Sequence, residues 1–359
     1  MSKRTIGILT GGGDCPGLNA AIRGIAKTSI LDYGWNVIGI QDGYYGLMND
    51  LKRELTFKDV SNILPLGGTI LGTSNKANPF ASLEEGKKPI DVSDRVVENL
   101  EKWNIDALFC IGGDGTHAIA HQLSKKYPNI IGVPKTIDND LMCTEQTFGF
   151  DTACSFVTES LDRIHSTAQS HHRVMVIEVM GRYAGWIALE GGIAGGGDII
   201  LIPEMPFSWK KVVESVKVRS KLGKRFSIVV VSEGAHPDGE DMVVREVIKD
   251  SPDPLRLGGI GEMVADRIEK ETGHESRYTV LGHLQRGGSP SFFDRILATR
   301  YGVAAARLAK ENDFGKMVAL RGTDIVSASI EAATEGLKLV TPDMELIKAA
   351  KSVGTSFGV

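Results

Sequence analysis

Short, continuously apolar runs alternate along this chain with longer stretches in which apolar residues recur at helical spacing. The runs of strand length lie at residues 5–10, 35–40, 107–111, 130–133, 174–179, 199–202, 226–231 and 278–281. The helical stretches lie at residues 18–33, 57–64, 92–103, 152–170, 209–221 and 293–308. This alternation predicts parallel sheets with helices on both faces. Ligands of such sheets bind at the carboxyl ends of the strands, so we expect the chemistry in the loops that follow them.

A glycine-rich stretch, Ile-Gly-Gly-Asp-Gly-Thr at residues 111–116, directly follows one of these apolar runs. Gly112 and Gly113 leave no side chains at the strand end, and we expect Thr116 to cap the helix that follows. Backbone N–H groups and the helix dipole can hold an anion at such a turn. Asp114 adds a carboxylate there, which makes sense where a divalent cation bridges it to a phosphate.

The next strand is followed by a second polar stretch, Pro-Lys-Thr-Ile-Asp-Asn-Asp at residues 134–140. Its exit loop carries Lys135, Asp138 and Asp140, so two strand ends bring together the groups of a phosphoryl-transfer centre. Asp138 is the candidate general base, because a carboxylate near a metal stays ionised and can accept the proton of a hydroxyl. Asp114 and Asp140 are then the candidate Mg²⁺ ligands, directly or through water. The alternative interpretation of residues 138–140 is an Asx turn. Because residues 112–116 are expected nearby, we rank the catalytic interpretation above it.

Two further loops are candidates for phosphate binding. Residues 11–17, at the end of the first strand, resemble a second phosphate cradle, although glycines at such turns often serve only close packing. Residues 67–76 are rich in glycine, hydroxyl and amide groups and end in Lys76, so this loop can close over phosphates. A plain surface loop is the competing interpretation, and this stretch taken alone slightly favours it.

Forked, positively charged donors are needed to anchor a phosphorylated substrate. Candidates at or near predicted strand ends are Arg173, Arg277, His283 and Arg286. Taken singly, each is better explained as a structural ion-pair partner. Arg182, in the Met-Gly-Arg that follows residue 179, is placed to face the transferring phosphoryl group.

Composition narrows the class of protein. A chain of 359 residues is too long for one small core, so two lobes are expected. The formal net charge of −4 argues against a nucleic-acid partner, which needs a basic face. The four cysteines lack metal-site spacing and fit reduced thiols. No apolar run approaches about 18 residues and a strand follows the first residues directly, so we expect no membrane partner, no signal peptide and a cytoplasmic location.

The motifs at residues 12–19, 112–116, 134–140, 180–182, 232–233 and 282–288 occur in the order found in 6-phosphofructokinases. The sequence resembles this family from about Thr5 to beyond Arg295. The resemblance implies transfer of a phosphoryl group from ATP–Mg²⁺ to the 1-hydroxyl of fructose 6-phosphate, giving fructose 1,6-bisphosphate and ADP. It also implies a homodimer or homotetramer whose sites are shared across a subunit interface.

The implied fold is α/β, with two Rossmann-like lobes, each a largely parallel sheet with helices on both faces, and the active site in the cleft between them. The larger lobe, for the phosphoryl donor, comprises residues 1–149 and about 285–338. The smaller lobe, for the sugar phosphate, comprises about 150–284 and about 339–359.

The resemblance also assigns roles to single residues. The catalytic positions are Asp138 as the base, with Arg182 and Thr136, and the magnesium carboxylates are Asp114 and Asp140. The donor-binding positions are Gly13, Gly112, Gly113, Asp114, Gly115, Thr116, Lys76 and Lys135. The sugar contacts are Thr136, Asp138, Asp140, Met180, Gly181, Arg182 and Glu233. The 6-phosphate cluster is Arg173, Arg277, His283 and Arg286, with Arg173 and Arg277 donated by a neighbouring subunit.

Two positions give opposite indications of the donor. Members of the family that use ATP have glycine where this chain has Gly115, whereas pyrophosphate users typically have aspartate. Lys135 occurs in pyrophosphate users and in a subset of ATP users. Because an aspartate would exclude a nucleotide while a lysine can coexist with one, Gly115 favours ATP, with pyrophosphate as the alternative donor. Many bacterial members carry a donor-steadying arginine in the loop where this chain has Asn75 and Lys76, and either can substitute for it.

Two other functions match part of the sequence. The stretch at residues 112–116 is shared with NAD kinases and diacylglycerol kinases, but those lack the loops at 138–140 and 282–288. A catalytically silent, nucleotide-sensing subunit would be expected to have lost the base or the arginines, which are present here. Effector positions of regulated bacterial members correspond to Arg23, Lys27 and Asp198, for which surface charge is an equally good explanation.

Overall fold

The computed structural model describes residues 3–82, 89–247 and 255–359. The chain folds into two compact units. Unit 1 consists of Met1–Asp151 and Arg286–Leu337, and unit 2 of Thr152–Gln285 and Lys338–Val359. The chain therefore passes from one unit to the other after Asp151, Gln285 and Leu337.

Unit 1 is built on an eight-stranded sheet with the order β14-β13-β5-β4-β1-β2-β3, in which β6 also pairs with β5. The strands are β1 (Thr5–Thr10), β2 (Asn36–Ile40), β3 (Lys52–Glu54), β4 (Ala107–Gly112), β5 (Ile130–Thr136), β6 (Phe148–Gly149), β13 (Lys316–Arg321) and β14 (Asp324–Ser329). The central strands are parallel, while β3 and β14 add antiparallel edges. The apolar runs of the sequence form the buried centre of this sheet.

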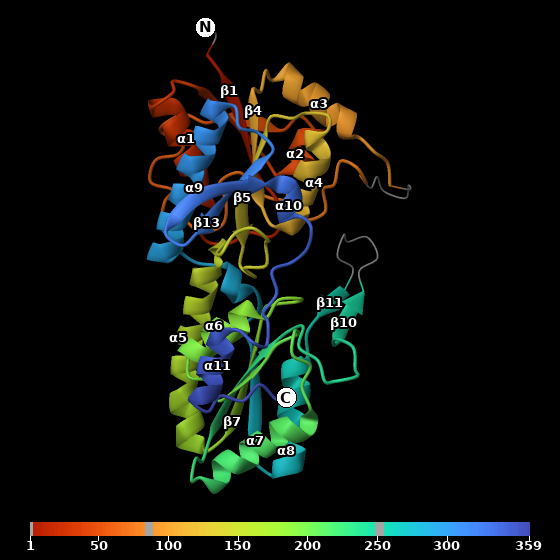
Figure 1. Cartoon of the computed structure of the whole chain (residues 1–359), viewed down its shortest axis with the longest axis vertical. Helices are drawn as coiled ribbons and strands as arrows, with labels where there is room; N and C mark the ends of the chain where they lie inside the picture. The colour runs from red at the N-terminus through yellow and green to blue at the C-terminus, as the bar shows by residue number, and fades with distance from the viewer. Residues whose placement is uncertain (1–2, 83–88, 248–254) are drawn as a thin grey trace. The chain divides into compact units, whose positions relative to one another are not determined.

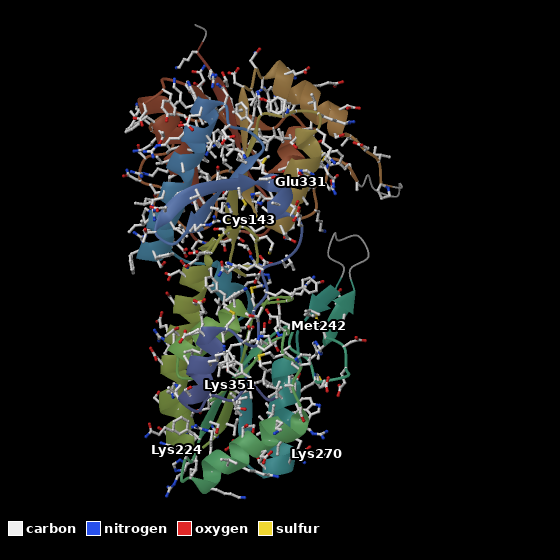
Figure 2. All side chains as sticks on the ribbon, viewed as in Figure 1. Cys143, Lys224, Met242, Lys270, Glu331 and Lys351 are labelled. Carbon is white, nitrogen blue, oxygen red and sulfur yellow. The ribbon has the colours of Figure 1, made fainter. Side chains whose placement is uncertain are left out.

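Helices cover this sheet: α1 (Leu18–Leu31), α2 (Tyr44–Met48), α3 (Ser93–Lys102), α4 (Asp114–Ser124), α9 (Phe292–Glu311) and α10 (Ile330–Ala333). Helices α1 and α9 lie side by side (Figure 1). Their backbones touch at Gly24 and Gly302, because a Cβ on Gly24 would lie 3.2 Å from the Cα of Gly302. Residues of α2, α3 and α4 pack with the sheet into one hydrophobic cluster, against which Cys143 lies (Figure 2).

Unit 2 contains a parallel four-stranded sheet with the order β12-β7-β9-β8. Its strands are β7 (Val174–Val179), β8 (Ile199–Leu201), β9 (Ser227–Ser232) and β12 (Ser276–Val280), and β10 (Val244–Val247) and β11 (Leu255–Leu257) form a separate antiparallel pair. The helices are α5 (Phe150–His171), α6 (Trp186–Ala194), α7 (Trp209–Lys221), α8 (Ile260–Thr272) and α11 (Glu345–Ser352). Apolar residues of α7 and α8 form one core cluster with β7 and β9.

The α/β class with largely parallel sheets is confirmed, but two local predictions were wrong. Residues 57–64 form turns and no helix. The carboxylate of Asp59 accepts hydrogen bonds from the backbone and hydroxyl of Thr56, a local arrangement that competes with helix formation, and Pro65 follows. Thr116 does not cap α4, which begins at Asp114. Within the described residues, no helix has the length and apolar character needed to cross a membrane.

Candidate active site

The loops that leave β1, β4 and β5 meet at one edge of the unit 1 sheet. These strands are parallel neighbours, with Thr10 opposite Ile111 and Gly112 opposite Pro134. The backbone N–H of Gly11 also donates to the carbonyl of Ile111 at 2.9 Å. The sheet therefore brings together the three stretches in which the sequence predicted phosphate and metal chemistry.

Thr116 explains why two of the glycines are needed. Its side chain is buried, and a Cβ on Gly112 would lie 2.2 Å from its Oγ1, while a Cβ on Gly11 would lie 2.6 Å from the same atom. Only glycine lets the first turn of α4 approach both strand ends this closely. At the exposed start of α4, by contrast, a Cβ on Gly115 would meet no atom of the described residues within 4 Å. Space for a ligand therefore lies beside Gly115.

Lys135 is part of β5 and not of the exit loop that the sequence indicated. Its side chain is only 3% exposed, and its ammonium group donates to the carbonyl oxygen of Gly13 at 2.5 Å. Burial lowers the pKa of Lys135 from its usual value. The lysine thus ties the loop after β1 to the end of β5.

Arg286 lies against the same loop. One guanidinium nitrogen donates to the carbonyl oxygen of Asp14 at 3.3 Å, and a Cβ on Gly13 would lie 2.9 Å from that nitrogen. The neighbouring Cys15 is buried, and burial raises the pKa of its thiol to about 12, so it remains protonated. Within unit 1, Arg286 is therefore placed with the glycine loop of β1, and its part in 6-phosphate binding stays a prediction.

The loop with the candidate base is anchored by Asn139. This residue is 3% exposed and adopts the left-handed conformation (φ 52°), which asparagine tolerates. Its side-chain oxygen accepts from the backbone N–H of Thr147 at 3.1 Å, and the backbone N–H of Asp138 donates to Thr136 Oγ1 at 3.1 Å. Asp138 and Asp140, on either side, remain partly exposed. The buried amide thus holds the turn that presents both carboxylates.

The carboxylates fit a magnesium ion that arrives with phosphates. Among the described residues, no group of three or more His, Cys, Asp or Glu side chains is placed to hold a metal by itself. Asp114 and Asp140 follow neighbouring strands, and Mg²⁺ is usually bound by one or two carboxylates together with substrate phosphates. Their chemistry therefore matches a metal shared with the donor.

The loop with the proposed donor-steadying residues also reaches the first glycine loop. The hydroxyl of Thr73 donates to the carbonyl of Gly12 at 2.6 Å, and the backbone N–H of Gly12 donates to the carbonyl of Ser74 at 3.2 Å. Asn75 and Lys76, which follow, are both exposed. The structure thus brings their loop to the glycines, and the choice between the two side chains stays open.

In unit 2, a second set of candidates gathers at the carboxyl edge of the sheet. Met180, Gly181 and Arg182 follow β7, Glu233 follows β9 and His283 follows β12. Gly181 has a φ of 130°, which a residue with a side chain rarely adopts. The structure therefore places the predicted sugar contacts of this unit on adjacent loops.

Two residues outside the predicted set hold these loops together. Ser232 donates its hydroxyl to the carbonyl of Gly181 at 2.6 Å. Gln285 is 1% exposed, accepts from the backbone N–H of Met180 at 3.3 Å and donates to the carbonyl of Gly282 at 3.1 Å. In the sequence, only its place inside the motif at 282–288 indicated that Gln285 has a role. Its contact with Met180 could not be predicted, because the two residues are far apart along the chain.

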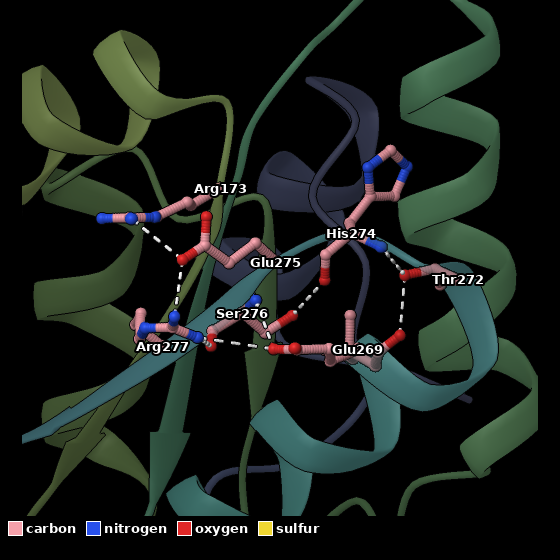
Figure 3. A network of polar contacts seen from close by, with 8 residues as sticks. Arg173, Glu269, Thr272, His274, Glu275, Ser276 and Arg277 are labelled. Atoms are coloured by element: carbon pink, nitrogen blue, oxygen red, sulfur yellow. Dashed lines mark hydrogen bonds and ion pairs between the residues drawn. The ribbon is translucent and has the colours of Figure 1, made fainter.

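Arg173 and Arg277 lie at the opposite, amino edge of the same sheet. Arg173 precedes β7 and Arg277 is near the start of the parallel strand β12, paired with Met175. Both guanidinium groups bind the carboxylate of Glu275 (Figure 3). The six residues of β7 separate this edge from the loop at Met180 by about 20 Å. The structure brings the two arginines together but not next to the carboxyl-edge loops of the same unit.

Comparison with known proteins finds relatives along most of this chain. A family model described as Phosphofructokinase matches residues 5–309. The "ATP-dependent 6-phosphofructokinase 2" of Clostridium perfringens is 55% identical over 99% of this chain and 98% of its own length. The "Pyrophosphate--fructose 6-phosphate 1-phosphotransferase" of Streptomyces coelicolor is 49% identical over 98% of this chain and 99% of its own length. A solved structure, the Pichia pastoris phosphofructokinase in the T-state, has a TM-score of 0.80 and 32% identity, covering 99% of this chain, which spans 37% of that fungal chain.

Proposed function

This chain belongs to the phosphofructokinase family, and on that premise we propose that it transfers a phosphoryl group from ATP to the 1-hydroxyl of fructose 6-phosphate. The products are fructose 1,6-bisphosphate and ADP. The observation that carries the proposal is the meeting of three strand exits in unit 1, where glycine loops and carboxylates share one edge. Such an edge provides donor binding and an acidic group for the acceptor hydroxyl together.

The donor is held by backbone groups and by charge. The glycine turns at residues 11–13 and 112–115, with the start of α4, receive the donor phosphates, because N–H groups and the helix dipole favour anions there. Asp114 and Asp140 hold Mg²⁺, which neutralises negative charge on the phosphates when bound. Lys135 stabilises the glycine turn at residues 11–13 by its hydrogen bond to the carbonyl oxygen of Gly13.

Asp138 acts as the general base. Its loop is fixed by the buried Asn139, so the carboxylate has a defined place from which to accept the proton of the 1-hydroxyl. In unit 2, the loops with Met180, Arg182 and Glu233 bind the sugar, and Gln285 and Ser232 keep these loops in place. The chain's own residues thus supply positioning and proton transfer.

ATP is the donor that Gly115 favours. A nucleotide needs room beside the helix start, and Gly115 offers open space there without a carboxylate to repel the phosphates. The alternative is pyrophosphate, which is supported by Lys135 and by the 49% identity to the Streptomyces coelicolor enzyme. Because the ammonium group of Lys135 is already bonded to Gly13, it adds less to donor choice than Gly115 does.

The active form is an oligomer with shared sites. Arg173 and Arg277 are about 20 Å from the carboxyl-edge loops of their own unit, too far for one hexose phosphate to reach both. A second copy of the chain that presents its two arginines to those loops removes this difficulty. Cys15, Cys110, Cys143 and Cys154 form no disulfide in the described part of the chain and fit the reducing cytoplasm, where we place the reaction.

Initial rates with fructose 6-phosphate and Mg²⁺ test the function, with ATP and pyrophosphate compared as donors. Turnover with ATP and none with pyrophosphate is the expected result. Turnover with pyrophosphate alone would show that Lys135 and not Gly115 selects the donor. No turnover with either would overturn the assignment of the substrate or of the enzyme.

A further inference from the structure

Glu275 binds two arginines with a single oxygen atom. Its Oε1 lies 2.9 Å from a guanidinium nitrogen of Arg173 and 2.5 Å from one of Arg277 (Figure 3). Since both nitrogens contact the same oxygen, they can be no more than 5.4 Å apart. The hydrogen bond from Arg173 lowers the pKa of Glu275, so the carboxylate is ionised at neutral pH. One carboxylate therefore bridges two cations that repel each other.

The backbone fixes the three residues at one place. The carbonyl of Glu275 accepts from the backbone N–H of Val174 at 3.0 Å, and Ser276 pairs with Val174 in the parallel register of β12 and β7. Glu275 therefore lies immediately before one strand and Arg173 immediately before its neighbour. Neither residue can leave this edge without breaking the start of a ladder.

The two guanidinium groups are held unequally by the rest of the protein. Arg277 also donates to the carbonyl of Ser276 at 2.8 Å and lies 3.5 Å from a carboxylate oxygen of Glu269. The Nε of Arg173 is buried and has no hydrogen-bond partner among the residues that the structure describes. The direction of the Arg173 guanidinium is therefore set chiefly by Glu275.

We propose that Glu275 is a positioning residue that holds Arg173 and Arg277 side by side so that both bind the same phosphate monoester. The inference rests on the proposed function, in which these arginines bind the 6-phosphate of fructose 6-phosphate. The carboxylate uses one nitrogen of each guanidinium, and Arg277 remains about half exposed, so further N–H groups of this arginine are accessible to a ligand. Without the Glu275 carboxylate, the two guanidinium groups repel each other and separate. Binding of the phosphate must then bring them together, which lowers the affinity.

The test is the Michaelis constant of the full-length enzyme for fructose 6-phosphate. In Glu275→Ala, this KM rises roughly tenfold, while kcat and the KM for ATP change little. Glu275→Met also lacks the oxygen but keeps the length of the side chain, and its KM rises to a similar extent. Glu275→Gln retains an oxygen acceptor in the same place and restores most of the affinity. A purely structural defect would lower kcat and the affinity for both substrates together.

Glu269→Ala is the matched control, because it removes a carboxylate that approaches Arg277 at 3.5 Å but does not bridge it to Arg173. Its KM for fructose 6-phosphate stays within about twofold of the wild type. In a background that carries both Arg173→Ala and Arg277→Ala, adding Glu275→Ala produces no further rise, because Glu275 acts through the arginines.

Two kinds of result would overturn the proposal. An unchanged KM for fructose 6-phosphate in Glu275→Ala and Glu275→Met would mean that the carboxylate does not help the arginines to bind the phosphate. A lower KM would mean that the carboxylate competes with the phosphate for the arginines. A further rise on the background that lacks both arginines would mean that Glu275 acts elsewhere. Failure of the underlying function is a separate result: Arg173→Ala and Arg277→Ala would then leave the KM for fructose 6-phosphate unchanged, or the wild-type enzyme would not turn this substrate over.

Discussion

The ammonium group of Lys135 donates a hydrogen bond to the carbonyl oxygen of Gly13, and this contact joins the end of β5 to the loop after β1. The lysine is almost fully buried, and its hydrogen bond links two stretches that are far apart in the sequence. The bond gives Lys135 a function that does not depend on which donor is used. It orders a loop in which Gly12 and Gly13 have no side chains of their own to do so.

We expect Lys135→Met to raise the KM for ATP by about tenfold or more, since a hydrogen bond to a charged group contributes about 1.5–3 kcal/mol. Initial rates at varied ATP measure the effect. The exposed Lys125, replaced by Met, is the control and leaves the KM unchanged. If Lys135→Met retained ATP kinetics but lost a pyrophosphate-dependent rate of the wild type, the lysine would be a selector of the donor instead.

Gly115 provides the sharper test of donor choice. We expect Gly115→Asp to fold, because a Cβ there meets nothing within 4 Å in the described part of the chain. Its carboxylate repels the nucleotide phosphates, and the KM for ATP rises roughly a hundredfold, equivalent to about 2.7 kcal/mol. Gly115→Ala, which adds the Cβ without the charge, is expected to lose less than tenfold. Equal losses in the two variants would show that space, and not charge, matters at this position.

Asp138→Asn removes the general base and keeps the shape of the side chain. We expect kcat to fall by about 10²–10⁴-fold, with the KM for fructose 6-phosphate within a few-fold of the wild type. Steady-state rates with both substrates varied give the two constants separately. The exposed Asp241, replaced by Asn, is the control with full activity. Near-normal kcat in Asp138→Asn would remove this residue from the role.

Much of the architecture of this site could be predicted from the sequence, because strand ends and glycines are local signals. The parallel alternation placed residues 112–116 and 138–140 on neighbouring loops, as the structure has them. Helix α6 was not predicted, since Trp186–Ala194 is apolar or glycine apart from Glu190 and shows no helical periodicity. Strand β14 was missed for the opposite reason: Asp324–Ser329 is half exposed and has no apolar run.

Contacts that depend on strand register could not be predicted in the same way. The bridge from Glu275 to Arg173 exists because β12 pairs with β7 in one particular register, and nothing near either residue encodes it. The contact of Lys135 with Gly13 likewise depends on β4 lying between β5 and β1. Motifs therefore identified the reacting groups, whereas the residues that position them emerged only from the folded chain.

His117 gives the stability of unit 1 a dependence on pH. The ring is buried beneath Gly132, and its Nδ1 lies 2.8 Å from the carbonyl oxygen of Gly113. Burial lowers the pKa of His117 from 6.5 to about 4. Between pH 6.5 and about pH 4, His117 is protonated in the unfolded chain but stays neutral in the folded chain. The folded state therefore loses stability as the pH falls through this range. The loss amounts to about 3 kcal/mol.

Urea unfolding of the wild type and of His117→Gln, at about pH 7.5 and about pH 5, measures this effect. The variant is less stable at the higher pH, because the hydrogen bond to Gly113 is lost, and the difference between the two proteins shrinks as the pH is lowered. The exposed His171, replaced by Gln, is the control and shows the wild-type dependence. A difference that stays constant with pH would mean that His117 is not the group responsible.

Subunit mixing tests whether the arginines act in the site of a neighbouring chain. Asp138→Asn chains lack the base but carry intact arginines, whereas Arg277→Ala chains carry the base and lack one arginine. If Arg277 is donated by the partner, a mixed oligomer contains sites in which an intact base meets intact arginines, and activity reappears. If both residues act within one chain, every site in the mixture lacks one of them. We therefore expect that dissociating the two impaired variants and reassembling them together restores up to about half of the sites in a mixed pair, assayed at low fructose 6-phosphate. Differential tagging shows which mixtures contain both chains in one oligomer. Rates in those mixtures that stay at the sum of the separate variants would contradict the shared site. They would also leave unexplained why Arg173 and Arg277 lie at the edge of the sheet opposite to Met180 and His283.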